Sequence, residues 1–168
     1  MRNSADYTFE SLVKQYRQPL TGAAYHLCGD REAAFDIVQE TLVDAYRGFD
    51  GLREPEKAGA WLFAILRRKA ISHRNTRKSD VELIVEPTVP GPEDGESLVR
   101  DIVIEQMAKL PDEDREILAG KYLLGLSYRE LAESLGIKEG AIRVRCLRAK
   151  ERLRVILSGA GVKIPQKR

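Results

Sequence analysis

The sequence predicts an all-α protein made of two small helical domains joined by a flexible acidic linker. Apolar residues recur three and four positions apart along most of the 168 residues, and no stretch alternates apolar and polar residues as a strand would. One segment, residues 79–96, is rich in proline, glycine and carboxylates and interrupts this pattern. We therefore expect a first domain over residues 1–78 and a second domain over residues 97–168.

The first predicted helix begins near Phe9 and ends near Leu27, where the helical spacing of apolar residues stops. Pro19 lies inside this helix. Because its ring clashes with the preceding turn, we expect a kink or a split at that point. Gly29 supplies a stop signal, and Asp30 is a candidate N-cap for the next helix.

Two more helices complete the first domain. The second places apolar residues on one face from Ala34 to Phe49, and it ends before a loop at residues 50–55. The third is expected over about residues 57–77. Its first half is apolar, whereas residues 67–78 contain six Lys or Arg, one His and no acidic residue.

The second domain is predicted to contain four helices. The first covers about residues 97–109. Pro111 and the carboxylates after it suit the start of the next helix, which Gly125 ends. Ser127 and Glu130 have the spacing of a capping box, in which each satisfies a free backbone N–H of the other. Gly136 then separates this short helix from a last helix over about residues 139–157.

Residues 128–145 have the spacing of a helix-turn-helix motif. The small Ala132 allows the two helices to approach closely, and Gly136 permits a positive φ in the turn. The wedge between the helices would contain Leu131, Leu135, Ile137 and Ile142. Such a unit presents its second helix to the DNA major groove. The basic residues of that helix are Arg143, Arg145, Arg148, Lys150, Arg152 and Arg154. An ordinary helical hairpin with a solvated basic face is the alternative interpretation.

The basic half of the third helix, residues 67–78, is a second candidate for nucleic-acid binding. Phe63 is expected to be exposed, because its apolar neighbours already form one face. Aromatic side chains beside a basic helix suit stacking on unpaired bases. Trp61 lies in the same stretch, but a lone Trp is more often a core residue.

Four carboxylates form an acidic strip on the second helix. Glu32, Asp36, Glu40 and Asp44 stand four residues apart and make three like-charge contacts, each costing about 0.2–0.5 kcal/mol. A solvated face and a docking face for a basic partner helix explain this charge pattern equally well.

Composition narrows the possible functions. The net charge is only +2, but residues 51–80 carry +5 and residues 121–168 carry +8, which suggests polyanion contacts at two places.

The longest uncharged stretch, 12 residues, is too short to cross a membrane, and the first residues lack a signal-peptide core. Two distant cysteines and two histidines offer neither a metal nor a cofactor site and give a nuclease little support. We expect a cytoplasmic protein without cofactors.

Taken together and in this order, these segments resemble the sigma-70 family of bacterial transcription initiation factors, in particular its short extracytoplasmic-function (ECF) group. The resembling stretches are Asp36–Leu42, Ala60–Arg67, Leu110-Pro111 with Arg115, Gly125–Ala132, and Gly140–Arg145 with Arg148-Ala149. They extend over nearly the whole chain, and the joint pattern is more specific than a helix-turn-helix alone.

The resemblance implies a transcription initiation factor with no chemistry of its own, which binds core RNA polymerase and directs it to promoter DNA. The residues that would bind polymerase are Asp36, Gln39, Glu40, Thr41 and Asp44. Those that would melt and hold the minus-ten element are Arg53, Lys57, Trp61, Arg67, Arg68, Arg74 and Arg77. Those that would read the minus-thirty-five element are Lys138, Arg143, Val144, Arg145, Leu147, Arg148, Lys150 and Arg152. The acidic linker would thread the RNA path of the polymerase, and an anti-sigma factor is a further implied partner.

The chain departs from the family pattern at several positions. Arg68 and Ser72 stand where Asn and Asp are frequent, which implies unusual minus-ten preferences, and Leu147 is apolar where a polar residue is common. The main alternative function is a helix-turn-helix transcriptional regulator that acts without binding the polymerase core. A repressor needs neither the acidic strip nor the basic third helix, so these two features favour the sigma-factor interpretation.

Overall fold

The structure is a computed structural model that describes residues 7–80 and 102–162, without the side chains of residues 77–80. The helices are α1 (Phe9–Cys28), α2 (Arg31–Gly48), α3 (Ala58–Asp80), α5 (Asp112–Leu118), α6 (Tyr128–Leu135) and α7 (Glu139–Gly159). Residues 102–107 are also helical, and a π-helical turn, η4 (Ala119–Leu123), follows α5. No strand occurs in these two ranges, which confirms the all-α prediction. The predicted linker lies mostly outside the described residues, as does the start of the helix expected over residues 97–109.

Helix α1 continues through Pro19, so the predicted split is wrong. Leu12 and Leu20, on the two sides of the proline, are both fully buried, and this packing holds the turns in one helix. The helix begins with a capping box between Thr8 and Ser11, and it ends at Gly29 with a φ of 71°. A left-handed φ of this size favours glycine, which explains the stop.

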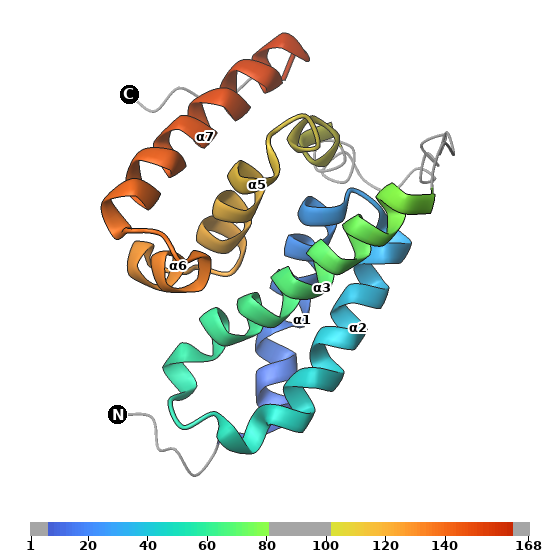
Figure 1. Cartoon of the computed structure of the whole chain (residues 1–168), viewed down its shortest axis with the longest axis vertical. Helices are drawn as coiled ribbons and strands as arrows, with labels where there is room; N and C mark the ends of the chain where they lie inside the picture. The colour runs from blue at the N-terminus through green and yellow to red at the C-terminus, as the bar shows by residue number, and fades with distance from the viewer. Residues whose placement is uncertain (1–6, 81–101, 163–168) are drawn as a thin grey trace.

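Helices α1, α2 and α3 pack against one another to form the N-terminal half (Figure 1). The side chain of Asp30 caps α2 by accepting hydrogen bonds from the backbone N–H groups of Glu32 and Ala33, as predicted. Two short 3₁₀ turns, Phe49–Gly51 and Pro55–Lys57, connect α2 to α3. The N-terminal half therefore closes as a three-helix unit, and the basic half of α3 directly follows its apolar half.

The C-terminal half, residues 102–162, contains the predicted helix-turn-helix in α6 and α7. The Ser127 hydroxyl accepts a hydrogen bond from the backbone N–H of Glu130, while the Glu130 carboxylate accepts one from the backbone N–H of Ser127, which confirms the capping box. Gly136 has a φ of 66° in the turn. Leu131 and Ile142, two of the predicted wedge residues, are fully buried.

The two halves are in direct contact, and their buried apolar residues form one cluster that runs from α1 to α7. Phe63 of α3 is 0% exposed, so the prediction that it is exposed is wrong. A Cβ atom on Gly120 would lie 2.6 Å from Cδ2 of Leu131 and 3.2 Å from Cζ of Phe63, so the backbone of η4 fits tightly between these side chains. The sequence pattern identified one apolar face of α3, but the C-terminal half covers a second one.

Candidate nucleic-acid interface

The recognition helix α7 exposes most of the residues predicted to read DNA. Its buried residues are Ile142, Cys146, Ala149 and Leu157, and the neighbouring positions therefore point outward. The exposed predicted residues are Lys138, Arg143, Val144, Leu147, Arg148, Lys150 and Arg152. Leu147 is 64% exposed, and its apolar side chain would suit contact with a thymine methyl group.

Two tyrosines that the sequence interpretation did not single out lie under the basic residues of the C-terminal half. The guanidinium carbon of Arg143 is 4.7 Å from the ring centroid of Tyr128, and the Lys121 ammonium is 4.4 Å from the same ring. Lys150 lies 5.6 Å from the ring of Tyr122. Cations at such distances are attracted to the ring faces. Tyr128 belongs to the predicted motif, but its role depends on the angle between α6 and α7, for which the sequence carries no signal.

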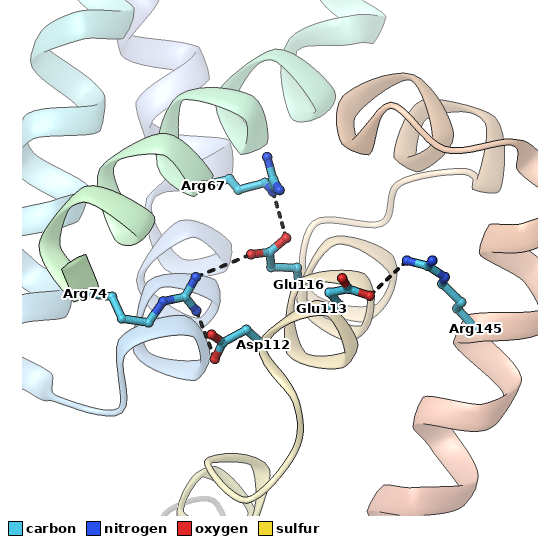
Figure 2. A network of polar contacts seen from close by, with 6 residues as sticks. All are labelled: Arg67, Arg74, Asp112, Glu113, Glu116 and Arg145. Atoms are coloured by element: carbon cyan, nitrogen blue, oxygen red, sulfur yellow. Dashed lines mark hydrogen bonds and ion pairs between the residues drawn. The ribbon is translucent and has the colours of Figure 1, made fainter. Parts of the chain in front are cut away.

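The basic end of α3 is largely paired within the chain. Nε of Arg67 donates to Oε2 of Glu116 at 2.7 Å, and Arg74 lies 3.0 Å from Oδ1 of Asp112 and 3.9 Å from Oε1 of Glu116 (Figure 2). Arg68 is exposed. The side chain of Arg77 lies outside the described part of the chain. Two of the arginines predicted to hold the minus-ten strand therefore contact carboxylates of α5.

The other predicted minus-ten residues lie at the start of α3. Arg53 and Lys57 are exposed, and a hydrogen bond to Glu54 raises the pKa of Lys57. Trp61 is half-buried, with Cζ2 3.3 Å from the position of a Cβ on Gly48. Trp61 thus packs against the end of α2, which agrees with the expectation that a lone Trp is a core residue.

Helix α5 also contacts the recognition helix. Nη1 of Arg145 lies 2.9 Å from Oε2 of Glu113, as Figure 2 shows, and Nη1 of Arg152 lies 2.6 Å from Oδ2 of Asp114. Seen together, Asp112, Glu113, Asp114 and Glu116 form what we call the α5 acidic cluster. Each member of this cluster pairs with an arginine that was predicted to bind DNA.

The acidic strip on α2 has a partner that the sequence did not reveal. Nζ of Lys69 on α3 lies 2.8 Å from Asp44 and 3.4 Å from Glu40. The hydrogen bond from Lys69 lowers the pKa of Asp44, and the same bond raises the pKa of Lys69. The interpretation of Glu40 and Asp44 as uncompensated like charges is therefore wrong.

Only part of the predicted polymerase-binding set is accessible. Asp36, Gln39 and Glu40 are exposed. Thr41 is 0% exposed, and its hydroxyl donates to the carbonyl of Ile37, so its assignment to a docking surface is corrected. Thr41 is instead part of the buried face of α2, where its hydroxyl hydrogen is satisfied by the backbone of its own helix.

Apolar side chains extend the exposed surface of α2 beside Gln39. Val43 and Tyr46 follow it on the same face, and Tyr46 is 68% exposed. Together with Phe9 and Val13 of α1 they line a shallow hollow between the two helices. Sequence reasoning missed Val43 and Tyr46. Their positions fall outside the helical spacing of the apolar face of α2, and this signal could have identified them as exposed.

Two classes of site are absent from the described ranges. Among residues 7–80 and 102–162, no group of three His, Cys, Asp or Glu side chains is placed to hold a metal ion. No helix in the same ranges has the length and apolar character needed to cross a membrane.

Comparison with known proteins identifies the class of this chain. Residues 12–79 match the family model of sigma-70 region 2, and residues 100–153 match that of sigma-70 region 4. The ECF RNA polymerase sigma factor SigL of Mycobacterium tuberculosis is 30% identical over 160 residues, covering 90% of each chain. SigW of Bacillus subtilis is 30% identical over 165 residues, covering 87% of each. The chain belongs to the sigma-70 family and, within it, to the ECF RNA polymerase sigma factors.

Solved structures agree with this assignment. The sigma factor RpoE of Bartonella quintana, in complex with the anti-sigma factor NepR, superposes with a TM-score of 0.78 at 27% identity, covering 89% of this chain and 96% of the other. CnrH, in complex with the cytosolic domain of CnrY, superposes with a TM-score of 0.65 at 25% identity, covering 90% and 88%.

Proposed function

We propose that this sigma factor directs core RNA polymerase to promoters by reading a minus-thirty-five element with α7 and by melting and holding a minus-ten element with α3. The observation that carries this proposal is the presence of two separate basic helices, one in each half. A helix-turn-helix regulator needs only the basic residues of α7. The second basic helix leaves Arg68 exposed and follows the exposed Arg53 and Lys57, and these side chains suit a separate contact with DNA phosphates.

The minus-thirty-five assignment rests on the exposed face of α7. We expect Arg143 and Arg148, which are exposed in the first half of α7, to reach base edges. Lys150 and Arg152, exposed farther along the helix, would contact phosphates. Arg148→Ala should therefore cost about 1–3 kcal/mol and relax selectivity at one or two positions. Arg129→Ala is a matched control, since Arg129 is an exposed arginine of α6 that pairs with Glu133 on its own helix. Equal losses on cognate and scrambled duplex DNA would remove Arg148 from the reading set.

The polymerase-docking assignment rests on α2. Its exposed face combines Asp36, Gln39 and Glu40 with the apolar Val43 and Tyr46, a mixture typical of the core of a protein interface with a polar rim. The charges of Asp36 and Glu40 suit a basic partner helix. Because RNA polymerase acts in the cytoplasm, we place the protein there as well. The anti-sigma factor NepR is bound to RpoE, and the cytosolic domain of CnrY is bound to CnrH. These two complexes support a regulatory protein partner for this chain.

In vitro transcription tests the proposal. Purified chain and core polymerase are combined on fragmented genomic DNA, and the starts of the transcripts are mapped. We expect starts that share two spaced sequence elements and that disappear without the chain. Starts identical to those of core polymerase alone would contradict the proposal. A titration with core polymerase distinguishes a sigma factor from the alternative, a helix-turn-helix regulator that acts without binding polymerase. Such a regulator would form no complex with the core enzyme.

A further inference from the structure

Three side chains from three elements meet at the start of the recognition helix. Tyr128 is the first residue of α6, Arg143 follows the first turn of α7, and Lys121 belongs to η4. The guanidinium carbon of Arg143 lies 4.7 Å from the ring centroid of Tyr128, and Nζ of Lys121 lies 4.4 Å from the same centroid. The ring of Tyr128 is therefore in contact with cations from both elements.

The surroundings of Tyr128 fix the position of its ring. A capping box sets the start of α6, and the side chain of Tyr128 packs against the apolar cluster that runs from α1 to α7. Lys121 is held as well, because its Nζ donates a hydrogen bond to the backbone carbonyl of Leu126 at 3.2 Å. Arg143, in contrast, has a long side chain that would sample many rotamers without such contacts. The ring thus serves as a fixed support for a flexible arginine.

The contact with Tyr128 leaves Arg143 able to bind a base. A guanidinium stacks on a ring through its face, and its N–H donors lie in its plane, where they remain available. In the free chain Nη2 of Arg143 donates to Oε1 of Glu139 at 2.6 Å, within α7. Exposed pairs of this kind are weak, and the Arg143 side chain is 58% exposed. A guanine base can therefore replace Glu139 while the ring stays in place.

We propose that Tyr128 is a specificity-determining positioning residue, which holds Arg143 in the orientation that reads a base pair of the minus-thirty-five element. The inference rests on the proposed base-reading role of Arg143. An arginine that is ordered before binding loses less conformational entropy when it contacts guanine. An arginine without this support would turn to phosphates or to other bases as well, and its discrimination between base pairs would fall. Tyr128 itself needs no contact with DNA.

Selection from a pool of promoters measures this discrimination. The chain is combined with core polymerase and with promoters found by start mapping, in which the upstream element has been randomised, and the bound duplexes are sequenced. We expect Arg143→Ala to lose the preference at one or two base pairs. Tyr128→Leu, which keeps an apolar side chain without the ring, should lower the preference at the same base pairs by about twofold to fivefold. Tyr128→Phe keeps the ring and should restore the wild-type preference.

Tyr122→Leu is the matched control. It removes another ring of the C-terminal half, which lies 5.6 Å from Lys150, and Lys150 is expected to contact phosphates. The preferences among base pairs should therefore stay as in the wild type. Tyr128→Leu combined with Arg143→Ala should lose no more preference than Arg143→Ala alone, since the tyrosine acts through the arginine.

Unchanged preferences in Tyr128→Leu, or an equal loss of affinity for all sequences, would overturn the inference and leave the reading role of α7 intact. The same holds if Tyr128→Phe loses as much preference as Tyr128→Leu, because the ring is then not the group that matters. Unchanged preferences in Arg143→Ala would instead contradict the base-reading role proposed for Arg143, and the inference with it.

Nuclear magnetic resonance of the isotope-labelled wild-type chain tests the contact without any change at Tyr128. A ring face beside the guanidinium should shift the Nε–H proton signal of Arg143 upfield, and Arg143→Ala identifies this signal by removing it. Tyr128→Phe should keep the shift. A signal of the wild-type chain at the ordinary position of an exposed arginine would overturn the inference, whatever the stability of Tyr128→Leu.

Discussion

The N-terminal and C-terminal halves bury their apolar residues in different ways. The N-terminal half closes a core among its own three helices, around fully buried residues such as Leu12, Leu20 and Leu66. The C-terminal half divides its core. Leu118 and Ala149 belong to a small cluster of their own, together with Met107 and Leu110, whereas Leu131, Ile142 and Cys146 join the cluster of the N-terminal half.

This difference gives the contact between the halves two roles. The C-terminal half obtains part of its apolar cover from α1 and α3, so the contact contributes to its stability. The same contact covers Phe63 and partly covers Arg67 and Arg74, two of the arginines that we propose to bind DNA. Four measurements test how far the two halves depend on each other.

The largest effect is expected at Phe63. Phe63→Ala removes a fully buried ring from the contact between the halves, and we expect a loss of about 3–5 kcal/mol in the free energy of unfolding. Urea denaturation followed by circular dichroism and by Trp61 fluorescence measures it. Phe35→Ala is the control: Phe35 is an exposed aromatic residue of α2, and its removal should change stability by less than about 0.5 kcal/mol. Similar losses in the two variants would show that the halves are apart in solution.

The second effect is a pH dependence from His26, which lies in α1 beside Leu123 of η4. Burial lowers the pKa of His26 to about 4 from its ordinary value near 6.5. Between these values the unfolded chain binds a proton that the folded chain excludes, so stability should fall by up to about 1.4 kcal/mol per pH unit as the pH drops from 6.5 toward 4. His26→Gln should remove this contribution, so the free energy of unfolding should depend less steeply on pH, by the amount that one proton contributes. Identical slopes in the variant and the wild type would contradict the assignment.

The third effect compares matched caps in the two halves. Thr8 and Ser127 each take part in a capping box, and replacing either by Ala should cost about 1 kcal/mol. If the shared cluster makes unfolding cooperative, both substitutions shift the Trp61 fluorescence transition equally. A Ser127→Ala variant could instead lose its helical circular dichroism at lower urea concentration while its Trp61 fluorescence transition stays as in the wild type. That result would show that the halves unfold independently.

The smallest effect concerns the acidic strip, entirely within the N-terminal half. Charge alone predicts that Glu40→Gln with Asp44→Asn relieves repulsion and stabilises the chain. Because Lys69 pairs with both carboxylates, we expect a slight loss of stability in a melting experiment instead. Asp36→Asn, one turn earlier, leaves Lys69 paired and serves as the control. A rise in the melting temperature of the double variant would restore the simpler electrostatic explanation.

Local signals predicted much of this molecule. Helical spacing, Gly29 with Asp30, the capping box of Ser127 with Glu130, and the positive φ of Gly136 depend on residues within one or two turns, and the structure confirms them. Pro19 is the exception, because tertiary packing on both sides of it outweighs its local preference.

Only the tertiary structure could decide which residues meet across the two halves. The burial of Phe63, the pairing of Lys69 with Asp44 and the pairing of Glu116 with Arg67 join positions that are 25 or more residues apart or lie on different helices. An amphipathic pattern shows that a helix has an apolar face, but it carries no information on what covers the other faces. The sequence alone therefore determined the helices, the helix-turn-helix and the family. The contact between the two halves depends on long-range packing of η4 and α6 against α3, which no local pattern encodes.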